Sequence, residues 1–207
     1  MSKTENAVLM TRAMTALQGK WGNAIGFIVV YLLITICPSW IPNVGGLIQF
    51  ILEGALQIGV ATFVLSISRQ QPATISQMFS DINRSMLSLG TYLLSTIFIV
   101  LWALLLIIPG IIAAYAYSMT FYIMVDDDKI GPLEAITKSK EMMRGNKWKL
   151  FCLHCRFIGW ALLCVLTAGI GFLWLAPYFM VSNAEFYADL KSGQAEQLAA
   201  PISVEPV

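Results

Sequence analysis

The residues best able to do chemistry in this chain form a polar row inside an apolar stretch. Gln49, Glu53 and Gln57 are spaced four positions apart, so a helix over 44–68 places their side chains along one face. A carboxylate inside a membrane is costly and is by default a functional candidate. The row could therefore line a polar path or hold a cation or a proton. The alternative is structural: Glu53, protonated or hydrogen-bonded, clamps neighbouring helices together.

Arg156 and Glu185 are the other two charged candidates within apolar stretches. Both are expected near the same end of their helices, so an ion pair between them is geometrically reasonable. Arg156 could instead snorkel, with its stem along apolar neighbours and its guanidinium at the membrane surface. Both arrangements give Arg156 a structural role.

The chain has few of the side chains that metal or redox chemistry requires. Cys152, His154 and Cys155 have the spacing of a redox or zinc motif, but a zinc site needs about four ligands and His154 is the only histidine. The four cysteines lie in or beside apolar runs and are expected to act as small buried apolar residues. The acidic run 126–128 is expected to be a solvated stop after an apolar helix. We predict no catalytic residue, no metal site and no cofactor, and an intramembrane enzyme is only a third alternative.

The elements that carry these residues are predicted to be membrane-spanning helices, because the chain is 57% hydrophobic and only 12% charged. Residues 87–125 contain no Asp, Glu, Lys, Arg or His, and a span takes about 20 residues, so this run divides into two spans near Pro109–Gly110. The remaining apolar runs predict four more. The six predicted spans are 22–37, 44–68, 87–108, 111–125, 150–167 and 172–187.

A polar segment precedes each predicted pair of spans. The segments 2–21, 69–86 and 126–149 each contain a stretch with apolar residues at helical spacing, which predicts amphipathic helices at the membrane surface. The plan of surface helix, span, short turn and returning span occurs three times, with a period of roughly 60–65 residues. The predicted fold class is all-α: a polytopic membrane protein with six transmembrane helices as three hairpins. Residues 1–190 form one domain, and 191–207 form a disordered cytoplasmic tail.

The distribution of cations predicts the orientation. Of thirteen Lys and Arg residues, three precede the first span, two lie in 69–86, six lie in 126–149 and one lies in the tail. The short turns near Asn43, Pro109 and Ala168 carry none. The positive-inside rule therefore places both termini and both long connections, with their surface helices, in the cytoplasm.

Five of these cations form a cluster that could bind anionic lipid headgroups. Each cation near a membrane surface contributes about 1 kcal/mol to such binding. The alternative is that the cluster only sets the topology. Its members are Lys138, Lys140, Arg144, Lys147 and Lys149.

Short motifs in a fixed order give the second half of the chain a family likeness. They are Ile107-Ile-Pro-Gly-Ile-Ile112, Tyr117-Ser118, Ala135-Ile-x-x-Ser139-Lys-x-Met-Met-x-Gly145-Asn-Lys147, Phe157-Ile-Gly-Trp160, Thr167-x-Gly-Ile-Gly171, Pro177-Tyr178 and Phe186-Tyr187. Over roughly residues 12–190, and most densely from 105 onward, the chain resembles the bacterial integral membrane proteins grouped as domain of unknown function 975. The resemblance implies a polytopic helical protein of the bacterial inner membrane. It implies no reaction, so no catalytic residue is transferred.

These observations favour a non-enzymatic protein of the inner membrane, an accessory or scaffold that acts through lipid or protein contacts. The alternative is a small-solute or ion transporter or channel with a polar path at Gln49, Glu53 and Gln57. The expected partners are the lipid bilayer, anionic lipid and a membrane protein. The net charge of only +1 favours no nucleic-acid partner.

Overall fold

The computed structural model describes residues 4–79, 82–167 and 169–199, and within these ranges it contains helices and no strand. The first half of the chain forms α1 (Asn6–Leu17), α2 (Trp21–Ile36), the 3₁₀ turn η1 (Cys37–Trp40), α3 (Gly45–Ser68) and the 3₁₀ turn η2 (Ile75–Phe79). The second half forms α4 (Ile82–Leu105), α5 (Ile107–Tyr117), α6 (Thr120–Asp126), α7 (Pro132–Met142), α8 (Lys147–Leu166) and α9 (Phe172–Ala199). The predicted all-α class is confirmed for the described residues.

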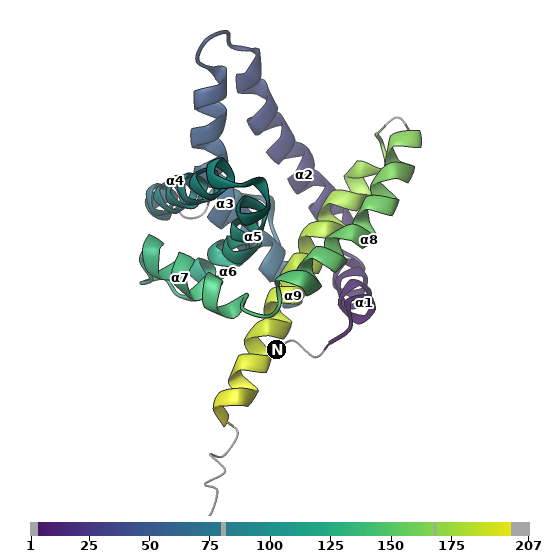
Figure 1. Cartoon of the computed structure of the whole chain (residues 1–207). Coiled ribbons are helices and arrows are strands. Elements are labelled where there is room, and N and C mark those ends of the chain that lie inside the picture. The colour runs from purple at the N-terminus through teal and green to yellow at the C-terminus, as the bar shows by residue number, and fades with distance from the viewer. Residues whose placement is uncertain (1–3, 80–81, 168, 200–207) are drawn as a thin grey trace, which may run out of the picture.

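The helices radiate from a common base. In Figure 1, α2 and α3 run side by side away from this base, and α8 and α9 form a second pair that diverges from the first. Helix α4 runs across the direction of α3 and is seen foreshortened. Helices α1, α6 and α7 lie at the base. The fold is therefore a set of diverging helix pairs that meet at one end.

The first two helices meet at a sharp bend. Helices α1 and α2 are bent by 95° with respect to each other, and Gly19 between them has a φ of +75°, which favours glycine. Helix α1 packs against α9, with Leu9, Ala13 and Leu17 fully buried. One predicted surface segment, 2–21, thus contains α1 and the turn into α2, while residues 1–3 lie outside the described residues.

The turn between α4 and α5 is shorter and earlier than predicted. Only Leu106, which is extended, separates the two helices, and Pro109 and Gly110 belong to the first turns of α5. A Cβ on Gly110 would lie 2.7 Å from the Ala103 Cα atom, so the two backbones touch at this glycine. The predicted division at Pro109–Gly110 is therefore wrong by a few residues. Proline is tolerated in a first helical turn because its missing N–H has no partner there.

The predicted fourth span, 111–125, is broken. Helix α5 ends at Tyr117 and α6 begins at Thr120, so Ser118 and Met119 interrupt the helix. The Thr120 hydroxyl donates to the Tyr117 carbonyl at 2.7 Å, which gives one backbone acceptor at the break a partner.

Four helical segments of the described chain are long and apolar enough to cross a membrane: Gly45–Ser68, Arg84–Leu105, Ile107–Asp126 and Lys147–Leu166. The bent pair of α1 and α2 would make a fifth if it counts as one span. Helix α2 alone has 16 residues, hence a length of about 24 Å, against a hydrocarbon core of about 30 Å. The structure thus supports a membrane protein with four or five candidate spans, and the predicted six spans in three hairpins stay a prediction.

The last helix extends beyond the predicted end of the domain. Helix α9 contains Pro177 near its start and continues to Ala199, although the sequence predicted a disordered tail from residue 191. The part of the predicted tail from 200 to 207 lies outside the described residues.

The core lies at the base, where helices from both halves of the chain meet. The rings of Phe27 and Phe63 are stacked with their centroids 3.9 Å apart, which joins α2 to α3. Helix α3 also packs against η2, where a Cβ on Gly59 would lie 2.5 Å from the Met78 carbonyl oxygen. The absence of a side chain at Gly59 is therefore what lets the chain after α3 fold back onto it.

Candidate functional site

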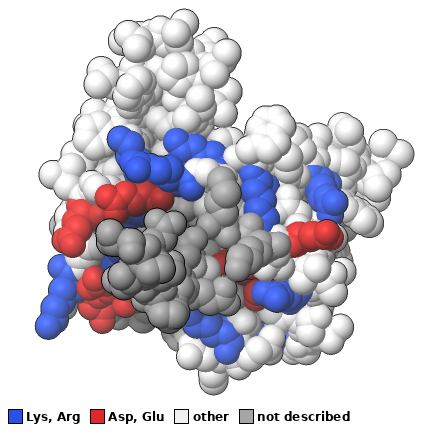
Figure 2. All heavy atoms as spheres, turned by 60° about the horizontal axis from the view of Figure 1, so that its bottom comes forward, with Lys and Arg blue, Asp and Glu red and all other residues white. Residues whose placement is uncertain are grey.

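Charged side chains gather at the base of the helix pairs. Figure 2 shows Lys, Arg, Asp and Glu on this face, whereas the part of the molecule that projects at the top of that view shows none. The charged end of the molecule is thus separate from this projecting part. Most of the visible charged side chains in this view therefore lie at the base.

Asp126, at the end of α6, is the centre of the most connected ionic group. Its carboxylate lies 2.5 Å from the Arg69 guanidinium, accepts a hydrogen bond from the Tyr187 hydroxyl at 2.9 Å and pairs with Lys191. Its side chain is only 10% exposed. Asp126 therefore ties the end of α3 and the second half of α9 to α6, and it is no solvated stop as the sequence suggested.

Two neighbouring ion pairs extend the same base. Arg84 at the start of α4 lies 2.6 Å from Asp128 and also donates to the Met124 carbonyl. Lys149 in α8 lies 3.5 Å from Asp189 in α9, and its ammonium group sits 5.8 Å from the centre of the Phe186 ring. The first pair ties the start of α4 to the segment after α6, and the second ties the start of α8 to α9.

The predicted basic cluster divides into three environments. Lys149 is bound to Asp189 and belongs to the ionic tie of the base. Lys138 and Arg144 are exposed, as is Lys140. Lys140 and Lys147 line the same cavity.

This cavity, called here the α4–α5–α7 slot, has a volume of about 160 Å³. Its walls are apolar and aromatic, except for the two lysines, and none of its lining residues is acidic. The lining residues are Trp102, Pro109, Ile112, Ala113, Ala116, Tyr117, Lys140 and Lys147. Two cations therefore border an apolar slot, an arrangement suited to a ligand with a negative head and an apolar body.

Helix α7, which carries one of these lysines, is locked to the break between α5 and α6. Ser139 is fully buried, and its hydroxyl donates to the Ala116 carbonyl at 2.8 Å while accepting from the Met119 backbone N–H at 3.2 Å. One side chain thus provides partners for two backbone groups that the break would leave without a helical bond. The following turn, at Gly145 with a φ of +78°, leads the chain into α8 and so places Lys147.

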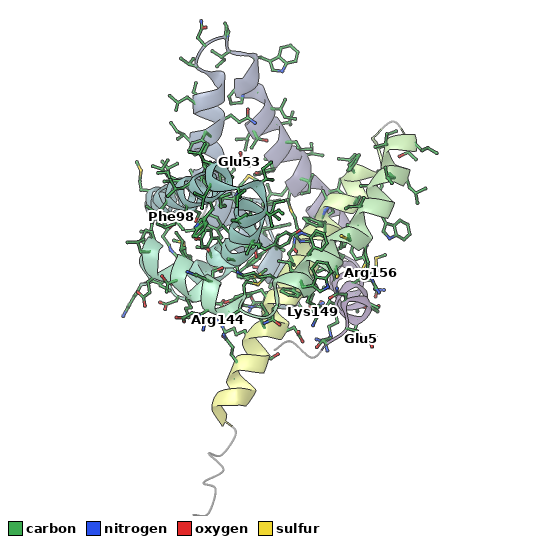
Figure 3. The ribbon with its side chains drawn as sticks, in the orientation of Figure 1. Glu5, Glu53, Phe98, Arg144, Lys149 and Arg156 are labelled. Carbon is green, nitrogen blue, oxygen red and sulfur yellow. The ribbon has the colours of Figure 1, made fainter. Side chains whose placement is uncertain are left out.

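The polar row on α3 lies away from the base. Gln49, Glu53 and Gln57 are all half-buried, and Figure 3 shows Glu53 midway along α3. The Tyr92 side chain of α4 shares a hydrogen bond with Glu53. At the next residue, the Ser88 hydroxyl donates to the Gly54 carbonyl at 2.6 Å. Glu53 therefore belongs to the contact between α3 and α4.

The predicted pairing of Arg156 with Glu185 does not occur in the described residues. Glu185 accepts a hydrogen bond from Ser68 at 2.8 Å and lines a cleft of about 490 Å³ with Arg12. Arg156 is exposed and lines another cavity with Glu5, and Figure 3 shows both beside α1. The physical reason is that Leu150, Leu153 and Phe157 form the buried face of α8, and Arg156 lies on its flank. Arg156 thus behaves as a surface residue.

The only histidine links three helices. The Tyr115 hydroxyl lies 3.2 Å from His154 Nδ1, and His154 Nε2 lies 2.9 Å from Asn183 Oδ1. Among the described residues, no three of the His, Cys, Asp and Glu side chains come together in a way that could hold a metal ion. His154 is therefore placed as a polar bridge between α5, α8 and α9.

Sequence reasoning missed Asp126 as an ionic centre and Ser139 as a buried lock. The signal for Ser139 was its position on the apolar face of the 133–144 helix, together with Ala135 and Met142, which are also buried. For Asp126 no local signal existed, because its partners Arg69 and Lys191 are more than fifty residues away on either side.

Comparison with known proteins gives a family and nothing more specific. Residues 103–194 match the family model described as a protein of unknown function, DUF975. No curated protein and no solved structure matches the chain. The match covers α5 to most of α9 and leaves out 12–102, which the predicted resemblance had included. The slot lysines, Ser139 and Asp126 all lie within the matched residues.

Proposed function

We propose that this protein is a non-enzymatic accessory or scaffold of the bacterial inner membrane, acting through contacts of its base with lipids or with a membrane protein. The base and both termini face the cytoplasm in this proposal. The cation distribution supports this orientation, because the charged side chains gather at the base and the α2–α3 and α8–α9 turns lie at the other end of the molecule.

One observation carries the proposal: four of the five clustered cations form no ion pair with a described residue. Among the residues that the structure describes, ion pairs occupy Arg69, Arg84, Lys149 and Lys191. Lys138, Lys140, Arg144 and Lys147 form none. Cations that hold no part of the fold together are available to a partner, and anionic headgroups or acidic side chains supply the matching charge.

The geometry around Glu53 gives less support to transport. A transporter would need a solvated cavity that reaches this carboxylate. The Glu53 side chain is instead bonded to Tyr92 at a close helix crossing. This arrangement is the one expected of a clamp between α3 and α4.

The proposal is tested with a photo-crosslinking amino acid at Lys138 or at Arg144 in the full chain, in native membranes. We expect a discrete adduct from these positions, either lipid, identified by its mass, or one membrane protein. The same group at Ile170, in the turn between α8 and α9, provides the control for unspecific capture. The absence of any adduct above this control at both positions would overturn the proposal.

A further inference from the structure

The α4–α5–α7 slot is built from two chemically distinct parts. Trp102 comes from α4, Ile112 and Tyr117 come from α5, and these residues form an apolar and aromatic wall. Lys140 from the end of α7 and Lys147 from the start of α8 supply two positive charges at the same slot. With no acidic residue in the lining, the slot has a net positive potential beside an apolar surface.

The two lysines are available to a ligand, unlike their neighbour Lys149. Lys149 is neutralised by Asp189, whereas neither slot lysine forms an ion pair among the described residues. Their positions are fixed by the backbone, because Ser139 anchors the turn before Lys140 and Gly145 directs the chain to Lys147. Two cations carried by backbone segments that are anchored in this way are better organised for one ligand than cations on a segment without such anchors.

The surroundings of the slot indicate where its ligand comes from. Leu104 and Ile108, which are close in sequence to the lining residues Trp102 and Pro109, are 84% and 72% exposed. A surface of this kind is stable only in contact with lipid or another apolar partner. The slot therefore opens toward the bilayer, and a ligand that enters it arrives from the lipid.

We propose that the α4–α5–α7 slot binds one anionic phospholipid, with its phosphate between Lys140 and Lys147 and part of one acyl chain against Trp102, Ile112 and Tyr117. Lysine is a point charge with three donors, so two lysines bind a phosphate without demanding a particular headgroup. The slot is selective for charge and discriminates against zwitterionic lipids. This inference rests on the proposed function and specifies the lipid contact within it.

The first test is native mass spectrometry of the full chain in detergent, titrated with phosphatidylglycerol or with phosphatidylcholine of the same acyl chains. We expect wild type to retain phosphatidylglycerol at least tenfold better. The double variant Lys140→Ala/Lys147→Ala should lose about tenfold or more in its affinity for phosphatidylglycerol. The double variant Lys138→Ala/Arg144→Ala removes the same charge from exposed positions outside the slot and should keep the preference.

The second test locates the acyl chain. Phosphatidylglycerol with brominated chains should quench the emission of Trp102, obtained as the difference between wild type and Trp102→Phe. Quenching should disappear in Lys140→Ala/Lys147→Ala and persist in Lys138→Ala/Arg144→Ala.

Three results would contradict the proposed binding of an anionic phospholipid in the slot. They are equal losses in the two double variants, equal retention of the two lipids by wild type, and displacement of the lipid by millimolar inorganic phosphate, which would mean that the headgroup anion alone is bound. Crosslinking from positions 138 and 144 is independent of the slot. If adducts form there while the slot tests give one of these three results, the proposed function is supported and the phospholipid site in the slot is refuted.

Discussion

The Tyr187 hydroxyl donates to the Asp126 carboxylate at 2.9 Å and so joins α9 to α6 across 61 positions of sequence. The ring of Tyr187 is also stacked on that of Tyr122, with centroids 5.5 Å apart. One tyrosine thus connects the ionic centre of the base to the aromatic packing above it. Since Arg69 and Lys191 converge on the same carboxylate, the base is held by this residue more than by any other in the acidic run.

The first prediction concerns this carboxylate. Asp126→Asn removes the charge that faces Arg69 and Lys191, and we expect it to lower the free energy of unfolding by about 2 kcal/mol. Asp128→Asn provides the matched control, because Asp128 is 76% exposed and its pair with Arg84 should contribute about 0–1 kcal/mol. Thermal or denaturant unfolding in detergent measures both. Equal effects of the two substitutions would refute the central role of Asp126.

The second prediction concerns the hydrogen bonds of Ser139, which hold α7 against the break between α5 and α6. Ser139→Ala leaves the Met119 N–H and the Ala116 carbonyl without their partner in a buried place, which should cost about 1–3 kcal/mol. Thr137→Ala, on the exposed face of the same helix, should change stability by no more than about 0.5 kcal/mol. Unfolding of the two variants side by side gives the comparison. A Ser139→Ala protein as stable as wild type would show that the break is held by other contacts.

The third prediction concerns the close approach of η2 to α3. Gly59→Ala places a Cβ 2.5 Å from the Met78 carbonyl oxygen and 2.8 Å from the Met78 Cα, so the backbone must move, at a cost of about 1–3 kcal/mol. Gly46→Ala in the same helix meets nothing within 4 Å and should stabilise by about 0.5–1 kcal/mol. We expect the melting temperature to fall in Gly59→Ala and to rise in Gly46→Ala, each relative to wild type. A stabilised Gly59→Ala variant would contradict this packing.

The fourth prediction separates a clamp from a transport site at Glu53. Glu53→Gln keeps an acceptor for Tyr92 and should leave the stability within about 1 kcal/mol, whereas Glu53→Ala removes the bond and should cost about 1–3 kcal/mol. Unfolding in detergent is measured for both variants, and proton and potassium flux is measured in proteoliposomes. Flux through wild type that Glu53→Gln abolishes would overturn the clamp and restore the transport hypothesis.

Apolar runs predicted the helical class and most helix positions because a long stretch without charge can only be buried or lie in lipid. They placed the α4–α5 turn at Pro109–Gly110, whereas it lies at Leu106, because proline and glycine are as compatible with a first helical turn as with a loop. The break at Ser118–Met119 was missed for a different reason. Its partner is Ser139, and a hydrogen bond across twenty positions leaves no local pattern.

The candidate site was predicted in part. The five clustered cations were recognised from composition, but the sequence could not show that Asp189 neutralises Lys149 while Lys140 and Lys147 line one slot. That distinction depends on where α4, α5 and α9 lie relative to α7. Likewise, the sequence could not show that Glu185 accepts a hydrogen bond from Ser68 instead of pairing with Arg156, because it does not determine the rotation of α8 about its axis.

The central claim is that the charged base faces the cytoplasm while the α2–α3 and α8–α9 turns face the opposite side. It is tested most directly by labelling single cysteines with a membrane-impermeant maleimide in a variant whose four native cysteines are replaced. In intact spheroplasts, Asn43→Cys and Ile170→Cys should be labelled, whereas Lys138→Cys should react only after the membrane is permeabilised. Labelling of position 138 in intact spheroplasts, with positions 43 and 170 protected until permeabilisation, would contradict the account.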